Sequence, residues 1–295
     1  MRFSALALDE IFEKSSKNCL LPRVQVGWGC KQMIHPTAII HPKARLHSTV
    51  EVGPYAVIDG EVELGAQCRV GPHVYLTGQT VAGIGNQFHA GSVVGDAPQD
   101  FKYSGEPTGV RIGDGNLFRE HVTVHRAASA GQLTEIGSHN LFMAHAHVGH
   151  NAVVGDHVIM ANGSLLAGHA VVQDRAFISG NCLVHQFTKV GRLAMMRGGS
   201  AISKDLPPFC TAVGENAICG LNTVGLRRAG FNAEQRLELK RLYHHLFRAG
   251  INMRSAVEQA RGLFESPASL QVLEFIQGAR RGVCPDRGGG LESED

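Results

Sequence analysis

Apolar residues recur at every sixth position along the chain from Ile34 to Ile202. Of the 29 positions reached in steps of six, 27 are apolar, and the two exceptions are Asp100 and Glu106. Neither an α-helix nor a single strand has a period of six residues. A glycine often follows the apolar residue, at positions 53, 65, 71, 95, 137, 149, 155 and 191. The pattern therefore predicts an all-β solenoid of short strands joined by tight corners.

Three hexads close one triangular coil in this interpretation, and the inward residues of stacked coils form one continuous core. We expect about nine or ten coils within residues 33–208. Residues 1–32 do not carry the repeat and form an N-terminal extension. We expect Met33 to be the working start, and an organelle-targeting leader is the alternative interpretation of residues 1–32.

The composition argues against several classes of protein. A formal net charge of +2 gives no strong case for a nucleic-acid-binding protein. No apolar run is long enough to form an integral membrane segment. The seven cysteines include no Cys-x-x-Cys pair, so we expect a reduced, cytoplasmic setting.

The repeat is interrupted at residues 97–108, where a loop must leave the solenoid at the cost of core contacts. Such a loop is either an inert surface excursion or a functional segment. Its polar side chains, which suit a sugar or a nucleotide, are those of Gln99, Asp100, Lys102 and Tyr103. A second excursion is expected at residues 126–133.

Histidines gather after the second excursion, at His147, His150, His169 and His185. His169 follows His150 by 19 residues and His185 follows His169 by 16, so each step is close to one coil. We therefore expect these imidazoles along one face of the prism. Any single one could be an ordinary surface histidine, but neutral imidazoles in a cluster suit general-base catalysis near pH 7.

Two chemistries fit such a cluster. Hexapeptide-repeat carbonic anhydrases hold zinc with three histidines, and His145 and His150 match the spacing of two of them. The third position, counted two coils upstream, is Gly109, which has no side chain to bind zinc, so one of the three ligands is missing. The other chemistry is acyl transfer, in which a base deprotonates a substrate hydroxyl that attacks a thioester. No Ser or Cys stands in a nucleophile-elbow sequence, which favours direct transfer over an acyl-enzyme.

Nine short stretches resemble the family of UDP-N-acetylglucosamine acyltransferases, which begins lipid A synthesis. They are residues 99–103 (QDFKY), 105–108 (GEPT), 122–126 (VTVHR), 140–143 (NLFM), 147–150 (HVGH), 166–169 (LAGH), 184–187 (VHQF), 205–208 (DLPP) and 225–231 (GLRRAGF). The resemblance covers about residues 33–281. It implies that the solenoid is a left-handed parallel β-helix of hexapeptide repeats.

The resemblance also implies residue roles. His150 would be the general base for the 3-hydroxyl of UDP-N-acetylglucosamine, and the backbone N–H of Gly168 would stabilise the oxyanion. The substrate-binding residues would be Gln99, Asp100, Lys102, His147, His169, His185, Gln186, Asn222 and Arg228, the last two on the donor or the nucleotide. One position near the end of the acyl groove limits chain length in the family. Counting on from residues 185–187 places it at Gly198, with Met195 nearby, so we expect a long 3-hydroxyacyl donor.

The family is a homotrimer with each site between two adjacent prisms, and its donor is a 3-hydroxyacyl thioester on acyl carrier protein. The resemblance implies no metal and no separate cofactor. A related N-acyltransferase shares the repeat but has an extra N-terminal domain, for which residues 1–32 leave no room. The sequence leaves open whether the acceptor carries a 3-hydroxyl or a 3-amino group.

Asn151 departs from the family pattern, in which an Asp commonly follows the base. An Asn side chain can orient the imidazole through a hydrogen bond but adds no negative charge. A catalytically altered or silent hexapeptide scaffold is therefore the alternative function.

Residues 209–281 are expected to form a C-terminal α-helical domain. Asn232 and Gln235 have the spacing of a capping box, and the helix that they begin is expected to extend to Ala249. A second helix is predicted for residues 253–264 and a third for residues 267–281. Residues 282–295 are expected to form a disordered tail.

Positive charge collects in this region. Residues 222–261 contain eight Arg or Lys and three Glu. This surplus could attract an acidic carrier protein, although solvated helix faces are an equally good interpretation from charge alone.

Overall fold

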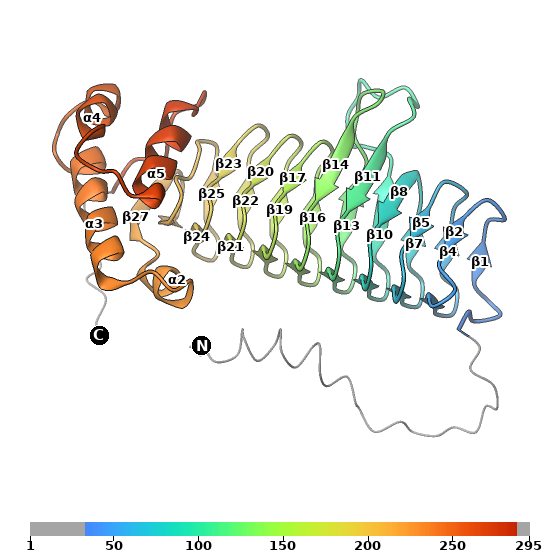
Figure 1. The fold of residues 1–295 in the computed structure, drawn as a ribbon. Coiled ribbons are helices and arrows are strands. Elements are labelled where there is room, and N and C mark those ends of the chain that lie inside the picture. Colours follow the sequence, from blue (N-terminus) through green and yellow to red (C-terminus); the bar gives the residue numbers. More distant parts are fainter. Residues whose placement is uncertain (1–32, 288–295) are drawn as a thin grey trace. The chain divides into compact units, whose positions relative to one another are not determined.

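Residues 33–287 are described by the computed structural model of this chain. The expectations for residues 1–32 and 288–295 lie outside the described residues. From Ile39 onward the chain forms parallel strands, most of them two residues long, which stack as three sheets around one axis (Figure 1). The predicted solenoid of short strands is confirmed.

Each sheet takes every third strand, as a triangular coil requires. The first sheet contains β1 (Ile39–Ile40), β4 (Val57–Ile58), β7 (Tyr75–Leu76), β10 (Val93–Asp96), β13 (Thr123–His125), β16 (His147–Val148), β19 (Leu165–Leu166), β22 (Leu183–Val184) and β25 (Ala201–Ile202). The second contains β2 (Arg45–Leu46), β5 (Glu63–Leu64), β8 (Gln79–Ala82), β11 (Gly109–Ile112), β14 (Leu133–Ile136), β17 (Val153–Val154), β20 (Val171–Val172) and β23 (Lys189–Val190). The third contains β3 (Glu51–Val52), β6 (Arg69–Val70), β9 (Gln87–Phe88), β12 (Leu117–Phe118), β15 (Leu141–Phe142), β18 (Ile159–Met160), β21 (Phe177–Ile178), β24 (Met195–Met196), β26 (Cys210–Val213) and β27 (Ala217–Leu221).

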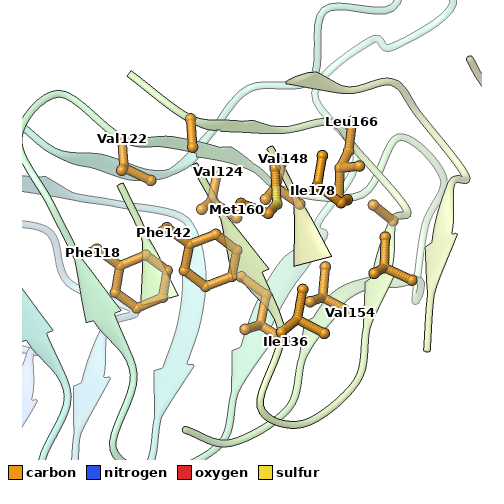
Figure 2. Packing of buried hydrophobic residues seen from close by; sticks show 14 of the residues in the cluster. Phe118, Val122, Val124, Ile136, Phe142, Val148, Val154, Met160, Leu166 and Ile178 are labelled. Atoms are coloured by element: carbon orange, nitrogen blue, oxygen red, sulfur yellow. The ribbon is translucent and has the colours of Figure 1, made fainter. Parts of the chain in front are cut away.

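The second residue of each two-residue strand points inward, and stacked coils bring these side chains into contact. The rings of Phe88, Phe118 and Phe142 lie on successive coils, with centroids 5.0 and 4.9 Å apart. Figure 2 shows how Phe118 and Phe142 pack beside the aliphatic residues of the other two sheets. This contact from coil to coil explains why the apolar residue is needed at every sixth position.

Two loops interrupt the coils at one edge of the prism, between the first and second sheets. Residues 97–108 connect β10 to β11 and residues 126–132 connect β13 to β14, and both loops project beside β11 and β14 (Figure 1). The inclusion of Ala130 in the hexad series was wrong, because this residue is exposed in the second loop. Both loops were expected. Because they add residues to their coils, the sequence separation of two residues on either side of a loop no longer gives the number of coils between them.

The helices follow a hairpin in which β26 extends the third sheet beyond Pro208 and β27 returns antiparallel to it. They are α2 (Thr223–Arg228), α3 (Ala233–Phe247), α4 (Met253–Ala260) and α5 (Pro267–Gln277). The capping box of Asn232 and Gln235 is confirmed. Each of the three expected helices ends two to four residues before the predicted position, and α2 was not expected. None of the helices within residues 33–287 has both the length and the apolar character that crossing a membrane requires.

The expected disordered tail was wrong for residues 282–287. Val283 forms a bridge with Asp205, and the side chain of Cys284 is fully buried. The Arg248 Nε atom of α3 lies 2.5 Å from a carboxylate oxygen of Asp286. The segment is ordered because its backbone forms hydrogen bonds with the last coil and its side chains pack against the prism and α3. The local composition of residues 282–287 does not predict these contacts.

Candidate active site

The edge between the first and second sheets carries most of the expected site residues. Residues 149–152, 167–170 and 185–188 form successive four-residue corners here, and we call this line of corners the histidine edge. The third residue of each corner has a positive φ, 58° at Asn151, 59° at His169 and 63° at Phe187. His150, His169 and His185 occupy the second, third and first positions of these successive corners, so their imidazoles share one edge of the prism, as expected.

A cleft of about 640 Å³ opens beside this edge. Its lining includes the expected residues Gln99, His147, His150, Gly168, His185 and Gln186, together with His125, Gly149, Leu165, Leu166, Ala167, Leu183, Val184, Ala201, Ile202, Ser203, Glu215 and Asn216. Outward-facing residues of the first sheet change along the cleft from His147 to Leu165, Leu183 and Ala201. The outward side chains of this sheet therefore change from polar to apolar along the cleft, and Ser203, Glu215 and Asn216 add polar groups beside Ala201.

His150 is held in one tautomer by its neighbour. Its Nδ1 lies 2.9 Å from Oδ1 of Asn151, and the same Oδ1 accepts a hydrogen bond of 2.9 Å from the backbone N–H of Ala128. An amide oxygen only accepts, so Nδ1 of His150 must carry the proton and donate it. In this tautomer of the neutral imidazole, Nε2 carries no proton and can act as an acceptor.

Gly168 lies one coil from His150, with its α-carbon close to the imidazole. A Cβ atom at position 168 would lie 2.5 Å from Nε2 of His150, closer than real Cβ contacts allow. Among residues 33–287, the backbone N–H of Gly168 has no hydrogen-bond acceptor, because it is the second residue of its corner. A residue whose backbone N–H has no acceptor among the described residues therefore has its α-carbon close to Nε2 of His150.

His125 is a site residue that the sequence interpretation missed. It lines the cleft with only 8% of its surface exposed, and its ring meets that of His147 edge-on, with centroids 5.0 Å apart. It lies within one of the stretches that carry the family resemblance. The interval of 22 residues to His147 includes the second loop, so counting in coils could not pair the two rings.

Burial lowers the pKa of His147 to about 4, and the neighbouring His125 and His150 act in the same direction. Burial also lowers the pKa of His125. A hydrogen bond of 2.8 Å joins Nδ1 of His147 to the hydroxyl of Thr123. Both imidazoles are therefore neutral at physiological pH.

The neutral His147 makes stability sensitive to acid. Its pKa is lower in the folded chain than the value of about 6.5 expected in the unfolded chain, so between about pH 6.5 and 4 the unfolded state binds more protons. The free energy of unfolding should therefore fall as the pH falls through this window, by about 2 kcal/mol at pH 5 from this group. We expect His147→Gln to remove most of that loss, measured by urea unfolding at pH 7.5 and 5. An equal loss in both proteins would contradict the assignment.

His169 lies between its two neighbours on the histidine edge. Its ring stacks on Phe187 with centroids 4.5 Å apart and meets the ring of His150 edge-on at 5.3 Å. Burial lowers the pKa of His169 and His150 acts in the same direction, whereas the carboxylate of Asp100 raises it. The loop of residues 97–108 therefore brings Asp100 near the histidines. Asp100 also accepts a hydrogen bond of 2.9 Å from the backbone N–H of Lys102.

Asn222 and Arg228 are not brought into the cleft of their own chain, whose described lining includes neither residue. Asn222 is the N-cap of α2, where its Oδ1 accepts from the N–H of Gly225 and its Nδ2 donates to the carbonyl of Leu193. Arg228 is the last residue of α2 and is exposed.

Gly198 lies at a different edge of the prism from His150. It belongs to the corner that enters β25, whose outward residue Ala201 lines the cleft. A Cβ atom at position 198 would meet only the carbonyl oxygen of Gly180, at 3.6 Å. Met195 is partly buried on the third sheet. The space beside Gly198 is open, as the expected long acyl chain requires.

The counting that gave Gly109 as the third zinc position was wrong, because the second loop, residues 126–132, lies within that interval and adds residues to a coil. The ring of His145 stacks on His121 one coil earlier, with centroids 5.2 Å apart. One coil before that, a Cβ atom at Gly91 would meet His121. Across residues 33–287, no three His, Cys, Asp or Glu side chains converge closely enough to hold a metal ion.

A prism of hexads with a histidine-lined cleft is the architecture of the hexapeptide transferases. The model described as bacterial transferase hexapeptide (six repeats) matches residues 133–168. The model described as Udp N-acetylglucosamine O-acyltransferase, Domain 2, matches residues 205–284.

Proteins named acyl-[acyl-carrier-protein]–UDP-N-acetylglucosamine O-acyltransferase are similar over most of the chain. The one from Myxococcus xanthus is 48% identical over 253 residues, which cover 85% of this chain and 98% of that protein. The one from Janthinobacterium is 43% identical over 258 residues, with the same coverage. The chain therefore belongs to this family of acyltransferases.

Solved structures agree with this assignment. The UDP-N-acetylglucosamine acyltransferase of Francisella novicida has a TM-score of 0.84 and 33% identity, covering 87% of this chain and 95% of that one. The Arabidopsis enzyme has a TM-score of 0.75 and 34% identity, covering 85% and 99%. The fold is a left-handed parallel β-helix of hexapeptide repeats followed by helices.

Proposed function

We propose that this protein transfers a 3-hydroxyacyl chain from acyl carrier protein to the 3-hydroxyl of UDP-N-acetylglucosamine, the first step of lipid A biosynthesis. The observation that carries the proposal is the pairing of His150, whose Nδ1 faces the Asn151 oxygen so that Nε2 can act as an acceptor, with Gly168, which lines the same cleft and has its α-carbon close to that Nε2. A base and an oxyanion donor at one place are what acyl transfer to a hydroxyl requires.

The reaction follows from these two groups. Nε2 of His150 takes the proton of the acceptor hydroxyl as its oxygen attacks the thioester carbonyl carbon. The N–H of Gly168 donates to the oxyanion that forms. When the intermediate collapses, the C–S bond breaks and the imidazolium returns its proton to the leaving thiolate. The Asn151 amide keeps Nδ1 as a donor throughout, so the ring ends the cycle in its starting tautomer.

The remaining polar residues would hold the substrates. Gln99, Asp100, Lys102, His147, His169, His185 and Gln186 are the proposed binding groups, and His125 joins them from its place in the cleft. His125 and His147 are neutral donors or acceptors, as burial keeps their pKa values low. Neutral groups suit a sugar, which presents hydroxyl and amide groups rather than charge.

We also propose that the site is completed by a second copy of the chain in a homotrimer. Asn222 and Arg228 lie on α2, outside the described cleft lining of their own chain, which suits a role in the cleft of a neighbouring prism. Light scattering should give three times the 31.6 kDa of one chain. Mixing His150→Ala with Arg228→Ala chains should restore about a quarter of the wild-type activity by random assembly. A monomer, or no recovery in verified mixed trimers, would contradict this assembly.

The carrier protein would dock on the helices. A second cleft of about 710 Å³ lies between α2 and α3, and its cationic lining residues are Arg227, Arg236, Lys240 and Arg248. An acidic carrier protein is attracted to such a surface, and the attraction acts mainly on the association rate.

One assay tests the function and separates its alternatives. Purified protein is incubated with a 3-hydroxyacyl carrier protein and UDP-N-acetylglucosamine, or with the analogue that carries a 3-amino group, and the products are detected by mass. We expect the 3-O-acyl product. Reaction of the amine alone would identify an N-acyltransferase, and no product with either acceptor would support a catalytically silent scaffold.

Gly198→Met should shift the donor preference towards shorter acyl chains. The added side chain would fill the open space beside Gly198, where the end of a long chain is expected. Each methylene that cannot be buried costs about 0.8 kcal/mol, so blocking a few of them should reverse a preference of about a hundredfold. The measurement is kcat/KM across donors of graded length. An unchanged ranking would show that Gly198 does not limit chain length.

A further inference from the structure

The asparagine beside the base poses a problem of orientation. The two oxygens of an aspartate are equivalent acceptors, but an amide has one acceptor end and one donor end. Turned by half a rotation, Asn151 would present its NH₂ group to Nδ1 of His150. That nitrogen would then have to accept, and the proton of the ring would move to Nε2. The base would be held in the tautomer that cannot take a proton.

The described structure fixes which way the amide points. Oδ1 of Asn151 faces His150 and also accepts from the N–H of Ala128, while Nδ2 donates to Oε1 of Gln132 at 2.6 Å. Both outer partners come from the loop of residues 126–132, so this loop recognises each end of the amide. The backbone N–H of Asn151 is itself held by the hydroxyl of Thr134, at 2.8 Å.

We infer that Gln132 is a positioning residue that keeps Asn151, and through it His150, in the orientation that leaves Nε2 free to act as the base. The inference rests on the proposed function, because it assigns Gln132 a role only if His150 takes a proton. Gln132 touches neither the reacting atoms nor the described lining of the cleft, and it acts through two successive hydrogen bonds.

A purely structural role for this side chain is a poor explanation. Gln132 is exposed and lies at the end of a surface loop, so its removal costs little buried area. Its side-chain bond is made to Asn151 rather than to a backbone group of the prism. The expected consequence of losing it is therefore a change in catalysis at nearly constant stability.

The experiment is a double-mutant cycle on the full chain. Gln132→Leu removes the acceptor and should lower kcat about fivefold to tenfold, with KM and the unfolding temperature nearly unchanged, because the Ala128 contact still favours the correct orientation. Gln132→Glu keeps an acceptor towards Nδ2 and should retain activity. In the Asn151→Asp background, where both oxygens accept, Gln132→Leu should change kcat less than twofold. Gln259→Leu, at an exposed glutamine of α4, is the matched control.

Each outcome decides a separate point. A loss with Gln132→Leu that is equal in the native and Asn151→Asp backgrounds would overturn the amide-orientation role, as would a loss below twofold in the native background. A loss of kcat confined to the native background supports the amide-orientation role. A change in the acidic limb of the pH–rate profile that occurs only in the native background supports it as well. Absence of transfer by the wild-type chain would instead reject the proposed function, before the variants are compared.

Discussion

Replacement of His150 by alanine is expected to lower kcat by about a hundredfold to ten-thousandfold, the range for loss of a well-placed general base. The two imidazoles nearest to it in the described cleft are poor substitutes: Nδ1 of His147 is engaged by Thr123, and the low pKa values of His147 and His125 make both rings weak bases. KM for the acceptor should change much less than kcat, because the sugar is held by other residues.

The fold should survive this substitution. His150 is only partly buried at a corner, and no inward-facing side chain of the prism is altered. Thermal unfolding of the variant should therefore match that of the wild type. His145→Ala is the matched control, because it removes an imidazole from a corner at a different edge. Near-normal turnover of His150→Ala, or an equal loss with His145→Ala, would refute the assignment of the base.

The second large effect is expected from Gly168→Ala, which adds a single methyl group. The new Cβ would lie 2.5 Å from Nε2 of His150, so the imidazole must move away from the place where the acceptor hydroxyl binds. A displacement of about 1 Å at the reacting atoms can cost a hundredfold in rate. The φ of Gly168 is not positive, so alanine is allowed by the backbone and the N–H donor is retained.

Gly180→Ala provides the control for this change. Gly180 is also the second residue of a corner, one edge away, and a Cβ atom there would meet only the carbonyl oxygen of Asn162, at 3.3 Å. We expect Gly168→Ala to lower kcat about a hundredfold and Gly180→Ala to lower it less than threefold, with similar unfolding temperatures. Comparable activity of the two variants would show that the base tolerates displacement or that Gly168 does not lie against it.

The six-residue period determined the fold from the sequence alone. It arises because the inward apolar side chain of each hexad packs against the corresponding side chain of the next coil. Ile34 to Val94 and Ile136 to Ile202 could be placed on inward faces by counting, and residues 150, 169 and 185 on one side of the prism. The capping box of Asn232 was likewise visible, since its two bonds join residues three apart. These features are local or strictly periodic, so their geometry follows from spacing.

Only the tertiary structure decided what the loops bring together. Their insertions break the count of coils, so the contact of His125 with His147 and the stack of His121 on His145 were not predictable from spacing. The hydrogen bond between Asn151 and Gln132 depends on the path of the second loop, which does not follow the six-residue repeat. The order of residues 282–287 depends on contacts with Asp205 and Arg248, far away in sequence. The sequence thus determined the prism and its histidine edge, while contacts across insertions determined the orientation of the His150 and Asn151 side chains, because side-chain geometry between distant segments depends on how the whole chain packs.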